Sequence, residues 1–316
     1  MNYALCFPGQ GAQEVGMGKL LYEAFGAAKE VFDEADDVLS MKLTRIIFNG
    51  PDEELKRTAI TQPAIMTTSI AAMRVLQKEM GVILKPSCGA GHSLGEYTAL
   101  VAAKVLQFRD AVDLVHKRGA WMQEAVPEGV GAMAALMGLD ADEVASVCAS
   151  VAPNMECQAA NINSPGQVVI SGLAEFVEKA IVVAKEKGAK KAIPLNVSAP
   201  FHSRLMMPVA EKLKERFEPC KWSDAEWPIV CNATAAPESS VEGLKKALFT
   251  QTYSPVRWAD SVMKMADNGA DTFLELGPGD VLSGLIKRCR KGLTVMAACT
   301  PDKLELMAKT ISGAAV

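Results

Sequence analysis

The chain has 316 residues, of which 49% are hydrophobic and 22% are charged. This is the composition of an ordinary globular protein, long enough for one large domain with an insert or for two domains. Its net charge of −4 argues against nucleic acid as the main partner, because phosphate binding draws on a surplus of Lys and Arg. The N-terminal residues lack a signal-peptide pattern, and no apolar run approaches the roughly 18 residues that span a bilayer. We therefore expect a cytoplasmic protein without a membrane partner.

The cysteines and histidines argue against two other kinds of site. Eight cysteines are scattered without a C-x-x-C pair, and several lie in apolar runs, as buried reduced thiols do. Only three histidines are present, and the ligand spacings of zinc sites are absent. We expect neither a disulfide framework nor a metal ion.

Apolar strand-like runs alternate with amphipathic helix-like runs along the chain, which is typical of an α/β fold. The first strand is predicted at residues 3–7, and the loop Pro8-Gly9-Gln10-Gly11-Ala12-Gln13 follows it. This loop does not match a dinucleotide-binding fingerprint, because the third glycine of that pattern would stand where the chain has Glu14. Further helices are predicted at residues 20–25, 28–39 and 64–80.

The sequence Gly91-His92-Ser93-Leu94-Gly95 lies between an apolar run at residues 86–90 and a helix-like run at residues 96–103. A serine on such a strand-to-helix turn presents its hydroxyl to solvent, and the N-terminus of the following helix is ready to stabilise an oxyanion. The alternative is an ordinary turn with two glycines. The strand before it and the helix after it favour a nucleophile elbow with Ser93 as the nucleophile.

Residues 131–195 differ from their flanks in the order of their elements, which is strand, helix, strand, strand, helix, strand. This is the ferredoxin-like order. We predict a small inserted domain at residues 128–196 and a large α/β domain formed by residues 1–127 and 197–316, with the substrate site in the cleft between them. The expected strands cover residues 131–137, 156–162, 167–171 and 190–195, and the expected helices cover residues 141–151 and 174–188.

A serine nucleophile needs a general base, and imidazole suits this role best at neutral pH. His92 precedes Ser93 directly, so we expect it to shape the turn, because neighbouring side chains diverge there. His116 lies within a helix-like run and is expected on the surface of that helix. His202 lies in a loop before a helix predicted at residues 205–217, from which the fold could bring it across the cleft to the serine. The alternative for His202 is a loop histidine that caps this helix.

Several motifs occur in a fixed order from one end of the chain to the other. They are Phe7-Pro8-Gly9-Gln10-Gly11-Ala12-Gln13, Gly91-His92-Ser93-Leu94-Gly95-Glu96-Tyr97, Arg118-Gly119, Asn161-Ile162-Asn163-Ser164-Pro165-Gly166-Gln167, Pro200-Phe201-His202-Ser203, Ser254-Pro255-Val256-Arg257-Trp258 and Glu275-Leu276-Gly277-Pro278-Gly279. Together they resemble the malonyl-CoA:acyl carrier protein transacylase family. The ordered set is far more specific than any one of its motifs.

The resemblance implies an α/β-hydrolase-like large domain that carries a ferredoxin-like insert, which agrees with the order of elements above. It implies a Ser93–His202 dyad in which a backbone carbonyl, that of Gln251 here, orients the histidine in place of an acidic residue. It also implies an oxyanion hole formed by the backbone N–H groups of Gln10 and Leu94. Without the resemblance, Gln10 would be interpreted as an ordinary loop residue.

The resemblance also assigns residues that contact the substrate. Arg118 lies on the otherwise apolar helix predicted at residues 111–124, and its guanidinium would bind the free carboxylate of a malonyl group through two hydrogen bonds. An exposed helix arginine is the alternative. Phe201 resembles the malonyl-selective pattern of related polyketide acyltransferases, which leaves little space for an α-methyl branch. Asn161 and Asn163 are candidate substrate contacts, although Asn-x-Asn-Ser-Pro-Gly is also good turn chemistry.

The function that the resemblance implies is ping-pong transfer of a malonyl group from malonyl-CoA to the phosphopantetheine thiol of an acyl carrier protein, in fatty acid biosynthesis and without a metal or redox cofactor. A polyketide role or another acyl-CoA donor is an alternative, as is a serine thioesterase or other hydrolase with the same dyad. A non-catalytic module that binds carrier proteins is a further alternative, and the complete set of site residues argues against it. Because the dyad is complete in one chain, we expect a monomer.

Acyl carrier proteins are acidic, so we expect a basic docking surface beside the cleft. Most runs of charged residues are simply solvent-exposed faces, so only the density of Lys and Arg suggests a cluster as the docking surface. The densest clusters are Lys185, Lys187, Lys190 and Lys191 in the insert, and Lys287, Arg288, Arg290 and Lys291 near the C-terminus.

Overall fold

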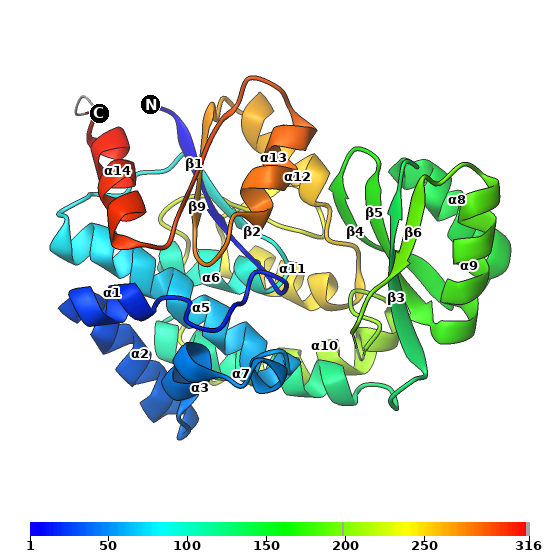
Figure 1. Ribbon diagram of the computed structural model, residues 1–316, viewed down its shortest axis with the longest axis horizontal. Helices are drawn as coiled ribbons and strands as arrows, with labels where there is room; N and C mark the ends of the chain where they lie inside the picture. Colours follow the sequence, from blue (N-terminus) through cyan, green and yellow to red (C-terminus); the bar gives the residue numbers. More distant parts are fainter. Residues whose placement is uncertain (198, 314–316) are drawn as a thin grey trace.

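The computed structural model describes residues 1–197 and 199–313, which form a large α/β domain and a smaller one beside it (Figure 1). The large domain is built on a six-stranded sheet with the order β10-β9-β1-β2-β7-β8. β1 lies in the middle of this sheet and runs parallel to both β2 and β9. The strands are β1 (Tyr3–Phe7), β2 (Cys88–Gly91), β7 (Ile229–Val230), β8 (Pro237–Glu238), β9 (Thr272–Leu276) and β10 (Thr294–Ala298).

β1 shows how the sheet divides the core into two layers. All five of its residues are buried, and because side chains alternate along a strand they point to opposite faces of the sheet. Leu5 and Phe7 join the core on the face covered by α5 (Thr58–Arg74), α6 (Leu94–Ala102) and α7 (Phe108–Glu124). Ala4 and Cys6 join the core beneath α12 (Trp258–Asp267) and α13 (Val281–Cys289). Both faces are therefore apolar, which explains why the strand reads as a continuous hydrophobic run.

The helices of the large domain cover both faces of the sheet (Figure 1). Two short irregular helices accompany them, a π-helix η1 (Val75–Glu79) and a 3-10 helix η2 (Arg204–Met206). Among the described residues, no helix is both long enough and apolar enough to cross a membrane. The α-helices are α1 (Lys19–Ala24), α2 (Gly26–Leu39), α3 (Leu43–Asn49), α4 (Asp52–Leu55), α5 (Thr58–Arg74), α6 (Leu94–Ala102), α7 (Phe108–Glu124), α10 (Met207–Phe217), α11 (Val241–Tyr253), α12 (Trp258–Asp267), α13 (Val281–Cys289) and α14 (Pro301–Ser312).

The small domain has the predicted ferredoxin-like order, with an antiparallel four-stranded sheet ordered β4-β5-β3-β6. Asp140 forms a capping box with Glu143, which explains why the helix after it begins where the sequence predicts. β4 is longer than predicted, and the turn after it is reduced to Pro165 and Gly166, the latter with φ of 71°. The elements are β3 (Gly131–Met137), α8 (Ala141–Val151), β4 (Cys157–Ser164), β5 (Gln167–Leu173), α9 (Ala174–Glu186) and β6 (Lys191–Pro194).

The helix predicted at residues 64–80 is wrong at both ends. The observed helix α5 begins at Thr58, so that Pro63 lies inside it, and η1 replaces its predicted last residues. A proline inside a helix has no N–H to donate to the carbonyl of the residue four positions earlier. For Pro63 that carbonyl belongs to Ala59, and the fold provides another donor for it.

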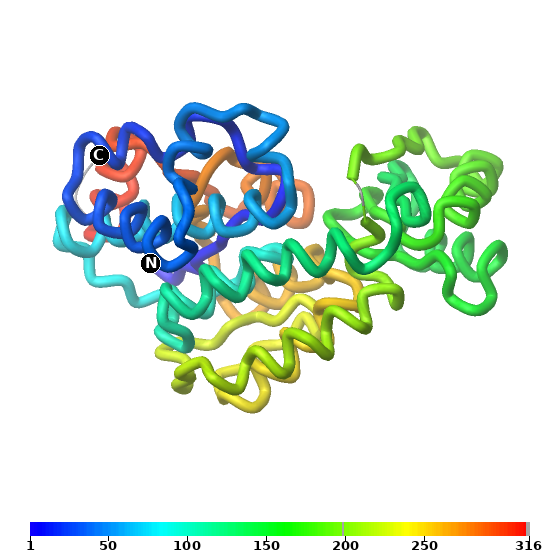
Figure 2. Tube along the Cα trace, turned by 90° about the horizontal axis from the view of Figure 1, so that it is seen from below, coloured from blue at the N-terminus to red at the C-terminus, as the bar shows by residue number. Residues whose placement is uncertain are grey.

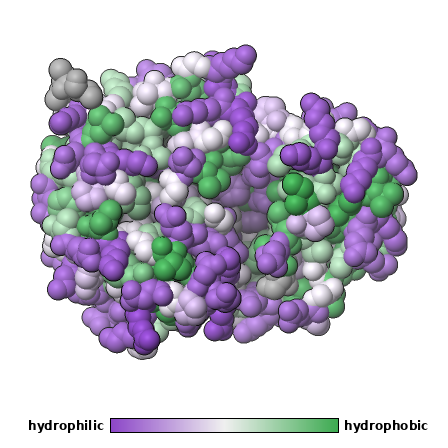
Figure 3. All heavy atoms as spheres, viewed as in Figure 1, coloured by the Kyte–Doolittle hydropathy of each residue, from purple (hydrophilic) through white to green (hydrophobic). Residues whose placement is uncertain are grey.

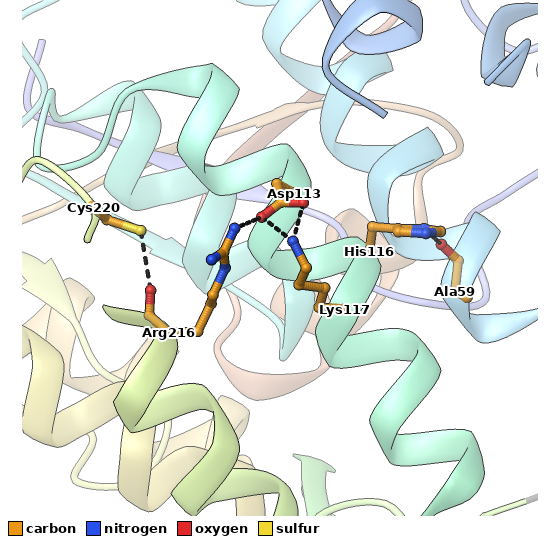
Figure 4. Close-up of polar contacts among 6 residues, drawn as sticks. All are labelled: Ala59, Asp113, His116, Lys117, Arg216 and Cys220. Atoms are coloured by element: carbon orange, nitrogen blue, oxygen red, sulfur yellow. Dashed lines mark hydrogen bonds and ion pairs between the residues drawn. The ribbon is translucent and has the colours of Figure 1, made fainter. Parts of the chain in front are cut away.

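His116 on α7 is that donor (Figure 4). Its Nδ1 lies 2.7 Å from the carbonyl oxygen of Ala59, and since a carbonyl only accepts, Nδ1 carries the proton. His116 is therefore half-buried between two helices, not displayed on a helix surface as expected. α7 and α5 lie so close here that a Cβ on Gly119 would collide with the Thr58 carbonyl oxygen.

An ion-pair cluster joins the same helix, α7, to α10. Asp113 accepts from Lys117 on its own helix and from Arg216 of α10, whose Nη2 lies 2.8 Å from Oδ2 of the carboxylate (Figure 4). α7 and α10 run side by side towards the small domain (Figure 2). α7 is thus attached on one side to α5 and on the other to α10.

We predict that His116→Ala destabilises the fold by about 1–3 kcal/mol, because it leaves the Ala59 carbonyl without its donor. Pro63→Ala restores a backbone N–H at this carbonyl, so the double variant should be less destabilised than His116→Ala alone. Urea unfolding of the wild type, both single variants and the double variant measures this coupling. Strictly additive losses would show that the histidine does not replace the missing helix bond.

Candidate active site

Ser93 lies on the turn between β2 and α6 with φ of 53° and ψ of −105°, a strained backbone conformation for a residue with a side chain. Its neighbours explain the glycines of the motif. A Cβ on Gly91 would collide with the backbone of Gly95, and a Cβ on Gly95 would collide with the carbonyl oxygen of Phe7. The turn therefore has the geometry of a nucleophile elbow, and it displays the serine at the carboxyl end of the central strands.

His202 meets this serine. Its Nε2 lies 2.7 Å from Ser93 Oγ, and its Nδ1 lies 2.8 Å from the backbone carbonyl oxygen of Gln251. A carbonyl only accepts, so Nδ1 carries the proton and Nε2 is the acceptor for the serine hydroxyl. Ser93 and His202 therefore form a dyad, and a backbone carbonyl orients its histidine.

The electrostatics of the site keep His202 neutral. Burial, and after it the positive charge of Arg118, lowers the pKa of His202 to about 3. The ring is 3% exposed, so a proton taken up there would form a poorly solvated cation. The imidazole is consequently available as a base throughout the neutral pH range.

Arg118 lies beside the nucleophile. Its side chain is 1% exposed, and its Nη2 donates to Ser93 Oγ at 3.1 Å and to Gln251 Oε1 at 2.9 Å. Nη1 donates to Gln62 Oε1 at 2.8 Å, and the guanidinium carbon lies 5.3 Å from the ring centre of Tyr97. This arginine is buried and faces the site, which contradicts the alternative of an exposed helix residue.

The loop that contains Gln10 lies so close to the elbow that a Cβ on Gly9 would collide with the carbonyl oxygen of His92. Gln10 lines the pocket in front of Ser93. Leu94 is the first residue of α6, and the first N–H groups of a helix have no partner within it. Leu94 thus directly follows the nucleophile, and Gln10 lines the same pocket as Ser93.

The pocket lies between the two domains, where Figure 3 shows the surface hollowed. Asn161 of β4 lines it, whereas Asn163 is not among its lining residues and accepts through its Oδ1 from His92 Nε2 at 2.8 Å. Phe201 is 8% exposed and stands at its wall next to the dyad histidine. Besides its polar groups, the pocket is lined by apolar side chains of both domains, Met122, Met133, Leu195, Val197 and Phe201.

Three residues of the site were not identified from the sequence. Gln62 holds Arg118, and Asn232 accepts from the Ser93 N–H through its Oδ1 at 2.7 Å. Glu96 accepts from the Asn232 backbone N–H at 2.9 Å. Glu96 belongs to the same motif as Ser93, but the sequence predicted no role for it. Nothing in the local sequence distinguishes Gln62 and Asn232 from ordinary amides.

The remaining predictions concern metal binding, the basic clusters and the cysteines. Among the described residues, no group of three or more His, Cys, Asp or Glu side chains could hold a metal ion. All eight residues of the two basic clusters are exposed, and Arg288 of α13 donates to Gln167 Oε1 of the small domain at 2.8 Å. The eight cysteines are free thiols.

A family model described as the acyl transferase domain matches residues 5–303. The chain belongs to this family. Malonyl CoA-acyl carrier protein transacylase of Bacillus subtilis is 51% identical over 98% of this chain and 96% of the relative, and that of Escherichia coli K12 is 45% identical over 96% and 97%.

Solved structures of the family superpose closely. The acyl-carrier-protein S-malonyltransferase of Bartonella henselae has a TM-score of 0.96 at 44% identity and covers 99% of this chain and 100% of its own. A malonyl-transacylase in complex with its type II PKS acyl-carrier protein has a TM-score of 0.94 at 44% identity and covers 98% and 100%. The predicted two-domain fold of this acyl transferase is thereby confirmed.

We predict that an uncharged fluorophosphonate labels Ser93, and that His202→Gln slows this labelling roughly 10²–10⁴-fold, as expected for loss of a general base. Because the pKa of His202 is lowered to about 3, the imidazole stays neutral and labelling by the wild type should hold its rate as the pH falls from about 8 to about 5. Intact-protein mass measures the rate. His116→Gln is the matched control, and equal slowing in both variants would count against His202 as the base.

Proposed function

We propose that this chain transfers a malonyl group from malonyl-CoA to the phosphopantetheine thiol of an acyl carrier protein. The observation that carries this proposal is the buried Arg118, whose Nη2 lies 3.1 Å from Ser93 Oγ. A cation this close to the nucleophile favours an acyl group with a carboxylate of its own. The malonyl transacylases among the relatives support the same donor and acceptor.

The proposed reaction has two half-reactions. His202 accepts the proton of Ser93 through Nε2 while Oγ attacks the thioester carbonyl, and the N–H groups of Gln10 and Leu94 stabilise the oxyanion. The carbon–sulfur bond then breaks, and the proton returns to the leaving thiolate of CoA. The carrier thiol, deprotonated by the same imidazole, next attacks the carbonyl of the malonyl-serine. The ester bond to Oγ then breaks, and the imidazolium returns its proton to Ser93 Oγ.

This chemistry uses a hydroxyl, an imidazole and backbone donors, so the proposal includes no metal or redox cofactor. We place the reaction in the cytoplasm and in fatty acid biosynthesis. A polyketide role is the alternative, and it is favoured by one observation, the similarity to the transacylase solved with a type II PKS carrier protein. Phe201 at the pocket wall supports malonyl over an α-branched acyl group, a preference worth about 1–3 kcal/mol per methyl group.

A hydrolase with the same dyad is the second candidate, and the apolar wall argues against it. Met133 and Leu195 of the small domain line the pocket together with Met122, Val197 and Phe201 of the large domain, and these side chains give it an apolar wall. A wall of this kind limits the access of water to an acyl-serine. The basic clusters on the small domain and near the C-terminus are proposed to attract the acidic carrier protein.

The experiment that tests the function is intact-protein mass after mixing with malonyl-CoA, repeated for Ser93→Ala and after addition of the carrier protein with its phosphopantetheine arm. We expect a malonyl adduct on the wild type, none on the variant, and transfer of the adduct to the carrier. Loss of the adduct mainly to water would establish a hydrolase. Absence of any adduct would refute the role of Ser93.

We predict that Arg118→Ala weakens malonyl transfer by about 3–5 kcal/mol, because the substrate carboxylate would be desolvated without a partner. Acetyl transfer has no such carboxylate and should be affected much less. Stopped assays of both acyl donors with the wild type, Arg118→Ala and Arg118→Lys measure the difference. Equal losses for malonyl and acetyl would show that the arginine does not select the carboxylate.

A further inference from the structure

Glu96 carries a buried carboxylate that the proposed reaction does not use. It lies in the first turn of α6 and is 1% exposed. Its Oε2 accepts from the Asn232 backbone N–H at 2.9 Å and from Gln251 Nε2 at 3.0 Å. Its Oε1 has no hydrogen-bond partner among the described residues. A buried carboxylate with these contacts, so close to a nucleophile, requires a physical reason.

The contacts fit the ionised form of Glu96. Both groups that reach Oε2 are donors, and a proton on Oε1 would find no acceptor. The N-terminus of α6 and the positive charge of Arg118 also favour a negative charge at this position. The anion is therefore the form that this arrangement of donors stabilises.

The anion determines how the side-chain amide of Gln251 is turned. Gln251 Nε2 donates to Glu96 and also to the Ser93 carbonyl oxygen at 2.9 Å, which leaves Oε1 directed at Arg118 Nη2, 2.9 Å away. An amide rotated by half a turn would place its oxygen against the carboxylate and its NH2 group against the guanidinium. Both contacts would be repulsive, so a charged Glu96 fixes the acceptor that holds Arg118.

We propose that Glu96 is a positioning residue: as an anion it fixes the Gln251 side chain, and through it the Arg118 guanidinium, for binding of the substrate carboxylate. The proposal rests on the proposed function of the same site. A protonated Glu96 donates its O–H to Gln251 Oε1, the amide turns over, and Arg118 loses one of its acceptors. The change moves one proton and breaks no covalent bond.

The titration that would drive this change can be assigned to Glu96. Burial raises its pKa to about 7, against the opposing effects of the Asn232 N–H, the Gln251 amide, Arg118 and the Cys231 thiol. Burial also raises the pKa of Tyr97 to about 12 and moves that of Cys231 well above its ordinary range. Burial, with Arg118, lowers the pKa of His202 to about 3, and the guanidinium itself stays charged. None of these neighbours changes its charge near pH 7.

The test compares the rates at which malonyl-CoA and acetyl-CoA acylate Ser93 in the wild type and in Glu96→Gln, from about pH 6 to about pH 9. A neutral glutamine reproduces the protonated state. In the wild type the malonyl-to-acetyl ratio should rise as the pH passes about 7, because Glu96 ionises there. In Glu96→Gln the ratio should stay at its low-pH value, roughly tenfold below the wild type at high pH.

Glu275→Gln is the matched control. Glu275 is also a buried carboxylate, and it accepts from the backbone N–H groups of Leu282 and Ser283, but it does not line the pocket. This control should keep the wild-type ratio and its dependence on pH. A Glu96→Gln protein that keeps both, or that loses malonyl and acetyl acylation equally, would overturn the proposal.

Two further results keep the outcome decisive. If circular dichroism shows Glu96→Gln to be unfolded, Glu96→Asp replaces it, and since an aspartate still ionises, a ratio independent of pH in that variant would refute the proposal. A wild type without any malonyl adduct would refute the proposed function instead, so the two failures are distinguishable.

Discussion

A guanidinium buried beside the nucleophile is the constraint on which the site depends. Removing a charge from water is costly unless hydrogen bonds and other groups compensate for it. For Arg118 these groups come from three different helices, namely Gln62 on α5, Tyr97 on α6 and Gln251 on α11. The hydrogen bond to Gln62 therefore requires α7 to lie close to α5. This close approach is seen at Gly119, where a Cβ would collide with the Thr58 carbonyl oxygen, and at His116, which reaches the Ala59 carbonyl.

The small domain is held to this scaffold by main-chain contacts, not by surface side chains alone. Val256 pairs with Asn161 of β4 as a bridge, with the Ile162 N–H donating to the Val256 carbonyl at 2.9 Å and the Val256 N–H donating to the Ala160 carbonyl at 2.8 Å. Backbone bonds of this kind fix the register of β4. They also position Asn161 of β4, which lines the pocket, relative to the large domain.

Local patterns allowed the elbow, the loop histidine and the order of the small domain to be predicted. These features depend on residues that are close in the sequence, such as the Asp140 cap and the flanking glycines of Ser93. The supporting residues could not be found in this way, because Asn232 is 139 positions from the serine whose N–H it accepts. The wrong start of the helix predicted at residues 64–80 has the same cause, since the donor that replaces the missing N–H of Pro63 is a histidine 57 positions from the carbonyl that accepts from it.

Burial shifts the two acid–base groups of the site in opposite directions. It disfavours any charge, so it lowers the pKa of His202 to about 3 and raises that of Glu96 to about 7. His202 consequently does not titrate near neutral pH, whereas Glu96, which orients Arg118 through Gln251, titrates in that range. Protonation in this range would alter which acyl group is accepted and leave the capacity to attack it in place. The titration of the dyad histidine and the titration that affects substrate choice thus fall in different pH ranges, although Arg118 contacts both Ser93 and Gln251.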